Sequence, residues 1–138
     1  MDYRQLPGST APLIAAFNGR IFGLEREDGS VRWDNRLSTT GFPVHFDIAH
    51  GRIYAGVHNE LFCVDLDGGE LFWKVKLRFV GVTRVMVDGE RIYVASSGEL
   101  ECVGITGEPL WANGFEGKGY GVIALGLPDR LGRADEGA

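Results

Sequence analysis

Cysteine and histidine are scarce in this chain of 138 residues, which has two of the first and three of the second. The histidines, His45, His50 and His58, lack the spacing of metal ligands. The two cysteines, Cys63 and Cys102, stand far apart in the sequence. The sequence therefore predicts neither a metal site nor a bound cofactor.

Positive charge and long apolar runs are missing as well. The chain has 14 Lys and Arg against 19 Asp and Glu, a net charge of −5, whereas non-specific nucleic-acid binders have a basic surface. No apolar run approaches the roughly 18–20 residues that cross a bilayer. The start, MDYRQLPGSTAP, has no basic region followed by an apolar one, as a secretion signal would. We therefore expect a cytoplasmic protein with neither a nucleic-acid nor a membrane partner.

Helical periodicity is also absent, since no segment keeps a helical pattern of apolar residues over 11 or more positions. The chain instead has 21 glycines, many of them at turns between short apolar runs. A content of 44% hydrophobic and 24% charged residues is typical of globular proteins. The expected fold class is all-β, with eleven to twelve short strands.

One pattern occurs three times: a short strand, a tight turn with glycine, and a second strand that contains tryptophan. Each tryptophan follows its turn glycine by four positions. The copies are FGLEREDGSVRW (22–33), LFCVDLDGGELFW (61–73) and LECVGITGEPLW (100–111), with the pairs Gly29 and Trp33, Gly69 and Trp73, Gly107 and Trp111. The tryptophans are 40 and 38 residues apart, which is about the length of one β-propeller blade.

The strands predicted around these copies form three units. The units are 13–37 with three strands, 42–77 and 80–112 with four strands each, and a last single strand at 120–127. A polar leader, 1–12, precedes the units and a flexible polar tail, 128–138, follows them. If the strands of a blade are named a to d from the axis outward, the chain reads b-c-d, a-b-c-d, a-b-c-d, a. The first unit therefore lacks an inner strand, and the chain ends with a spare one.

The two cysteines occupy matching places in the second and third copies, where the first copy has Gly23. Small apolar residues fit such a place. We expect Cys63 and Cys102 to be buried structural thiols in a reducing compartment. A disulfide between adjacent blades is the alternative.

The repeat resembles the PQQ-like, or tryptophan-docking, repeat of quinoprotein-type β-propellers, whose pattern is roughly Tyr-Ala-Leu-Asp-Ala-x-Thr-Gly-x-x-x-Trp. Residues 62–73 fit it except that Gly68 replaces threonine, and 22–33 fit with Glu25 in the aspartate place. The resemblance covers roughly residues 13–127. It implies that the three tryptophans stack between neighbouring blades, against the matching glycines. Quinoprotein dehydrogenases, however, need a complete ring and often adjacent cysteines, so the resemblance does not extend to their cofactor.

Two polar groups are candidate sites of chemistry. Asp65 and Asp67 in the second turn could suggest calcium, but an EF-hand needs further ligands and a distal glutamate, so a plain hairpin turn is the better interpretation. His45 and Asp47 share one side of a predicted strand, yet no motif places a nucleophile beside them. We expect no catalytic residues and no enzyme activity.

The sequence predicts a ring closed by oligomerisation, because three blades cannot surround an axis alone. In this prediction the strand 120–127, through Tyr120, Val122, Ile123, Leu125 and Leu127, completes the first blade of another subunit. A homodimer of six blades is favoured, with a trimer of nine or a different chain supplying the missing blades as alternatives.

The expected function is a binding or scaffolding module that presents its loop face to a protein partner. The alternative is a lectin-like or small-ligand-binding oligomer, which exposed aromatic residues in the loops between blades would favour. The candidates for such residues are Phe42, Phe79 and Phe115.

Overall fold

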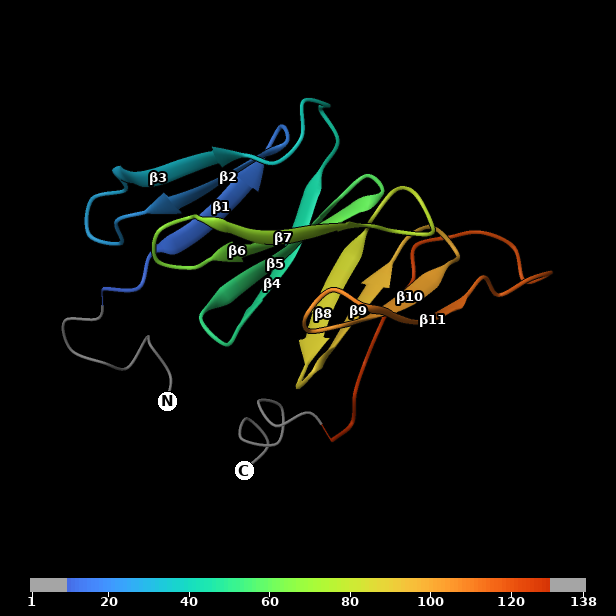
Figure 1. Ribbon diagram of the computed structural model, residues 1–138. Helices are drawn as coiled ribbons and strands as arrows, with labels where there is room; N and C mark the ends of the chain where they lie inside the picture. The colour runs from blue at the N-terminus through green and yellow to red at the C-terminus, as the bar shows by residue number, and fades with distance from the viewer. Residues whose placement is uncertain (1–9, 130–138) are drawn as a thin grey trace.

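The computed structural model describes residues 10–129, which form eleven strands in three antiparallel sheets (Figure 1). Blade 1 contains β1 (Leu13–Phe17), β2 (Arg20–Leu24) and β3 (Val31–Arg36). Blade 2 contains β4 (Val44–Ala49), β5 (Arg52–Val57), β6 (Glu60–Asp65) and β7 (Leu71–Lys76). Blade 3 contains β8 (Arg84–Asp88), β9 (Arg91–Ala95), β10 (Leu100–Gly104) and β11 (Pro109–Asn113). The all-β prediction is confirmed, and within 10–129 there is no helix long and apolar enough to cross a bilayer.

Tight turns between consecutive strands follow from residues that accept a positive φ. Asn18 and Gly19 have φ values of 53° and 73°, and His50 and Gly51 have values of 58° and 70°. A type I′ hairpin turn needs positive φ at both central residues, which glycine adopts without strain. Each of these turns therefore joins two antiparallel neighbours of one sheet.

The three blades share an irregularity at the same place. The register between the two outer strands shifts after Gly23 in blade 1, after Cys63 in blade 2 and after Cys102 in blade 3. The residue just before each shift is the register partner of a tryptophan: Gly23 of Trp33, Cys63 of Trp73 and Cys102 of Trp111. Both cysteines are buried and free. The sequence repeat is thus also a structural repeat.

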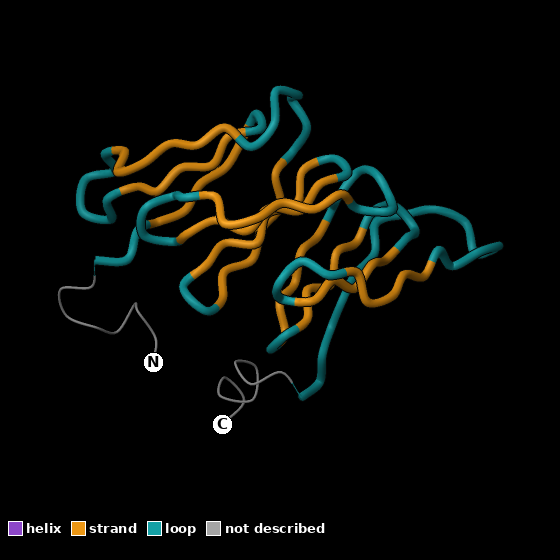
Figure 2. The backbone as a smooth tube through the Cα atoms, in the orientation of Figure 1, coloured by secondary structure: helices purple, strands orange, loops and turns teal. Residues whose placement is uncertain are grey.

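Blade 2 is the centre of the molecule because it packs on both neighbours (Figure 2). Alternate residues of a strand point to opposite faces of a sheet. On β5, Ile53, Ala55 and Val57 belong to the apolar cluster shared with blade 1, whereas Tyr54 belongs to the cluster shared with blade 3. Two apolar seams therefore hold three sheets side by side.

The described residues form an open arc of three sheets (Figure 1). Among the described residues, blade 1 has three strands in the order β1-β2-β3, so β1 lies at the edge of this sheet. Where the sequence predicts the strand 120–127, the structure has one isolated bridge, between Ser97 and Val122. Pairing of this segment in a ring stays a prediction. Most of the expected leader and tail, residues 1–9 and 130–138, lies outside the described residues.

Candidate functional site

The seam between blades 1 and 2 is built on a tryptophan that covers a glycine. A Cβ added at Gly69 would lie 2.4 Å from Cδ2 of the Trp33 ring. The Trp33 Nε1–H donates to the carbonyl of Leu66 at 3.3 Å, and Asn35 Nδ2 donates to the carbonyl of Gly69 at 2.9 Å. Blade 1 thus holds the outer turn of blade 2 by packing and by hydrogen bonds, to which Arg32 adds a third by donating to Asp67.

The seam between blades 2 and 3 repeats this arrangement. A Cβ at Gly107 would lie 3.3 Å from Cε3 of Trp73 and 3.2 Å from Cγ1 of Val75. Val75 stands where blade 1 has Asn35, two residues after the tryptophan. This seam is therefore more apolar, and its glycine is less tightly covered.

At each end of the arc, one member of this tryptophan–glycine contact is present without the other. Trp111 of blade 3 is 44% exposed. At Gly29 of blade 1, no atom of the described residues outside its immediate chain neighbours lies within 4 Å of an added Cβ. One end thus presents an uncovered tryptophan and the other an uncovered glycine.

Polar contacts between blades account for the acidic residues that the sequence analysis weighed as sites. Asp47 Oδ2 accepts a hydrogen bond from the Val87 backbone at 2.8 Å, which ties the inner strands of blades 2 and 3 together. Asp67 pairs with Arg32 of blade 1 at 2.7 Å. Asp65 Oδ2 accepts from the Gly68 backbone at 2.7 Å, as in a tight turn. These carboxylates serve turn geometry and blade packing.

Glu101 is a structural residue that the sequence analysis missed. Its side chain is buried, with 7% of the residue exposed, and its two oxygens accept from the backbone N–H groups of Arg78 and Phe79 at 2.8 and 2.9 Å. The matching places in the other blades hold Phe22 and Phe62. An acidic residue at a place that is otherwise aromatic was the signal that could have revealed it. Glu101 fixes the start of the link between blades 2 and 3.

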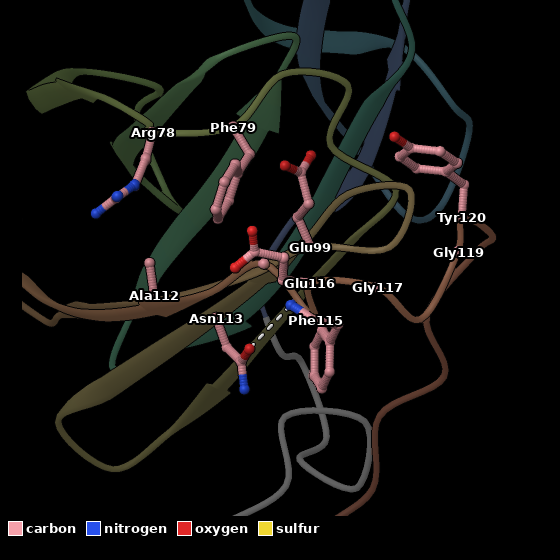
Figure 3. A pocket seen from close by; sticks show the side chains of 11 residues that line it. Arg78, Phe79, Glu99, Ala112, Asn113, Phe115, Glu116, Gly117, Gly119 and Tyr120 are labelled. Atoms are coloured by element: carbon pink, nitrogen blue, oxygen red, sulfur yellow. Dashed lines mark hydrogen bonds between the residues drawn. The ribbon is translucent and has the colours of Figure 1, made fainter.

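This link borders a hollow of about 720 Å³, which we name the loop-face hollow (Figure 3). Three loops form it: the β7–β8 link, the β9–β10 turn and the segment after β11. Its lining includes Arg78, Phe79, Glu99, Phe115, Glu116 and Tyr120. In the view of Figure 3 the carboxylate of Glu99 lies between the rings of Phe79 and Tyr120. The hollow combines aromatic surface with charges of both signs.

The buried cysteines are poor candidates for nucleophiles. Burial raises the pKa of the Cys63 thiol and of the Cys102 thiol above the usual value, so both stay protonated near neutral pH. Across residues 10–129, moreover, no group of three or more His, Cys, Asp or Glu side chains is arranged to hold a metal ion. The loop-face hollow, in contrast, is lined by aromatic and charged side chains, which can bind another molecule non-covalently.

Comparison with known proteins agrees with the repeat. The family model described as "Outer membrane protein assembly factor BamB" matches residues 17–120. The curated BamB of Salmonella typhimurium is 28% identical over 117 residues, which covers 72% of this chain and 29% of that protein. The crystal structure of BamB from Moraxella catarrhalis matches with a TM-score of 0.62 at 23% identity, covering 75% of this chain and 33% of that chain. The chain therefore spans less than a third of the length of the curated relatives it matches.

Some structural neighbours are enzymes. A europium-containing methanol dehydrogenase matches with a TM-score of 0.61 at 15% identity, covering 78% of this chain and 23% of that chain. At such identity the likeness shows the fold alone. The curated relatives are named as assembly factors.

The expectation of a cytoplasmic protein is wrong, because the curated relatives are named as factors of outer membrane protein assembly. The absence of a recognisable secretion signal in the printed sequence was too weak a basis for assigning a compartment. The same name also stands against the expectation that no membrane is involved. Because the family model matches residues 17–120, the chain belongs to the family of PQQ-like β-propeller proteins described as outer membrane protein assembly factor BamB.

Proposed function

We propose that the chain is a non-enzymatic scaffold that binds a protein partner at the loop-face hollow during the assembly of outer membrane proteins. The observation that carries this proposal is the composition of the hollow, whose lining combines Phe79, Phe115 and Tyr120 with Arg78, Glu99 and Glu116. Aromatic residues and arginine are enriched at protein–protein interfaces. The link to outer membrane protein assembly comes from the names of the curated relatives.

The proposal includes a ring. Exposed apolar side chains remain at both ends of the arc, among them Phe17 of blade 1 and Trp111 of blade 3. Covering such surface stabilises an assembly by about 25 cal/mol per Å². We favour two copies with six blades. Three copies with nine blades, or a different chain that supplies the missing blades, are the alternatives.

The test compares the chain with a relative. Each is immobilised and incubated with detergent-solubilised outer membranes of Escherichia coli, and captured proteins are identified by mass spectrometry. We expect the chain to capture at least one of the proteins that E. coli BamB captures. Phe115→Ser, at an exposed ring of the hollow, should abolish this capture. Val31→Ser, an exposed apolar residue of β3 outside the hollow, is the matched control and should retain it. No shared protein, or capture unaffected by Phe115→Ser, would contradict the proposal.

One observation favours the lectin-like alternative. Phe42 and Phe115, both in segments that follow an outer strand, are exposed, and Phe42 stacks on His58 with ring centroids 4.3 Å apart. Exposed rings in such loops can also hold a sugar or another small ligand. A glycan array probed with the labelled chain separates the two functions, because a scaffold for proteins should leave every spot at background.

A further inference from the structure

The segment after blade 3 enters its next element in the same way as the link after blade 2. Strands β5 and β9 both begin with Arg-Ile-Tyr, so His58 and Ser97 occupy the same place, six residues after the arginine. The carbonyl of His58 accepts from the N–H groups of Gly81 and Val82 at 2.8 and 3.2 Å, just before β8 begins. Ser97 makes its isolated bridge with Val122, which also follows a glycine. By this alignment, residues 123–127 correspond to residues 83–87, which include most of β8, the inner strand of blade 3.

Within residues 10–129, blade 1 has no strand that corresponds to this segment. Its first strand, β1, is an edge strand that stands in the place of β5 and β9 in the other blades. On β1, Leu13 and Phe17 are 56% and 63% exposed. The matching residues of β5, Ile53 and Val57, are buried against a neighbouring blade. An exposed apolar edge of this kind is a liability unless another strand covers it.

The exposed tryptophan is already in its docking orientation. Trp111 lies 6.1 Å from the Tyr93 ring at an interplanar angle of 46°, and Trp73 lies 6.2 Å from the Tyr54 ring at 47°. Trp73 covers Gly107 in this orientation, whereas Trp111 is 44% exposed and lies against no glycine of the described residues.

The uncovered glycine turn is equally well formed. The Gly29 N–H donates to the carbonyl of Glu25 at 2.9 Å, and the Gly69 N–H donates to the carbonyl of Asp65 at 3.0 Å. Both glycines have a φ of 76°. Since the backbone at Gly29 matches the one that Trp33 covers at Gly69, no rearrangement is needed to receive a tryptophan.

We propose that residues 121–127 of one copy form the inner strand of blade 1 in a second copy, and that Trp111 of the first copy covers Gly29 of the second. We choose a second copy as the partner because each chain has both the uncovered tryptophan and the uncovered glycine turn. The seams within one chain show how these two parts pack together. This inference rests on the proposed function only in assuming that copies of the chain assemble into a ring. Transferring the β4–β5 and β8–β9 registers pairs Ile123 with Phe17, Ala124 with Ala16, Leu125 with Ala15, Gly126 with Ile14 and Leu127 with Leu13.

The register can be tested with a double variant, Ala16→Cys with Ala124→Cys. Residues directly opposite in an antiparallel pair have Cα atoms about 4.5–5.5 Å apart, within the range of a disulfide. Mild oxidation of the purified full chain should join two copies on a non-reducing gel. The matched control is Ala16→Cys with Leu125→Cys, whose side chains point to opposite faces, and it should cross-link at least about tenfold less. Equal cross-linking in both variants, a bond within one chain, or none in the first would overturn the proposal.

Solution mass gives a second, independent readout. Light scattering should give the parent chain a mass of at least two copies, and Trp111→Ala should reduce it to one copy with an unchanged far-ultraviolet circular dichroism spectrum. A monomeric parent chain at micromolar concentration would overturn the proposal. Both experiments use the chain alone, so their failure leaves binding at the loop-face hollow untouched, and failure of partner capture leaves the copy-to-copy interface untouched.

Discussion

Trp33 occupies the space in which any side chain at position 69 would begin. A Cβ there would lie 2.4 Å from the indole, and the φ of Gly69, 76°, already disfavours residues other than glycine. Two independent constraints thus meet at one glycine. At Gly29 the same φ is present without the covering ring. The difference between these glycines isolates the packing contribution of a blade seam.

Gly69→Ala should therefore destabilise the chain more than Gly29→Ala. Each substitution pays about 1–2 kcal/mol for a left-handed backbone, but only Gly69→Ala also displaces a packed ring, which costs about 1–3 kcal/mol more. Urea unfolding measures both, in chains that also have Trp111→Ala so that no second copy covers Gly29. Equal losses at the two positions would show that Trp33 yields without cost.

Glu101 gives a second prediction. Glu101→Ala leaves the N–H groups of Arg78 and Phe79 without their acceptor, and should lower the unfolding free energy by about 1–3 kcal/mol. Glu101→Gln keeps one acceptor oxygen and should lose less. In a ¹⁵N spectrum, the amide signals of these two residues should shift in both variants. If Glu101→Ala proved neutral, the link before β8 would be held by other contacts.

The repeat made the seams predictable and left the links between blades less so. The turns at Gly29 and Gly69 follow from local turn chemistry and from the alternation of strands, both of which are written in sequence. The packing of Trp33 on Gly69 across a seam was implied by the family resemblance. The path of a link depends on distant contacts such as those of Glu101, which sequence spacing does not encode. The sequence predicts a strand at 120–127, yet β-pairing requires a partner strand, and within the described part of the chain this segment makes only a bridge to Ser97.

The candidate site, too, was only partly predictable from the sequence. Phe79 and Phe115 were singled out by their place in the loops, but the hollow that they line arises only when three loops converge. The contacts of Asp47 and Asp67 with a neighbouring blade were likewise not foreseen, because they join residues far apart in the sequence. The compartment was the clear failure, because the absence of a recognisable secretion signal does not report where a protein works.

The two cysteines should be unreactive in the folded chain. Burial raises the pKa of both thiols, so little thiolate is present at neutral pH, and reagents have no access. We expect reaction with a chromogenic disulfide reagent to be at least about a hundredfold slower than at an added exposed cysteine, Thr39→Cys. Urea should remove the difference. Rapid labelling of Cys63 or Cys102 without denaturant would show that a seam opens in the native state.

The ion pair of Arg32 with Glu25 gives a prediction about pH. The hydrogen bond from Arg32 is the main cause that lowers the pKa of Glu25 below its usual value. A carboxyl group with a lowered pKa in the folded state stabilises that state above its unfolded pKa, about 4.3. This contribution is lost as the pH falls through the lower, folded pKa.

The stability difference between the parent chain and Arg32→Gln should therefore be constant above about pH 5 and shrink below about pH 4. Because the pair is still partly open to solvent, added salt should also reduce the stability difference. A difference independent of pH would assign the effect to packing.

Trp73 and Trp111 allow folding and assembly to be separated. Trp73 is packed inside a seam, so Trp73→Ala should lower the unfolding free energy by about 3–5 kcal/mol at every protein concentration. Trp111 lies on the open face of blade 3, so Trp111→Ala should leave the stability of a single chain nearly unchanged. It should instead abolish the dependence of the unfolding midpoint on protein concentration that an assembly of copies shows. Urea unfolding of the parent chain and both variants at two concentrations a hundredfold apart measures these effects. A Trp73→Ala chain as stable as its parent would mean that this indole is not a packing residue, and that it is free to hold a ligand.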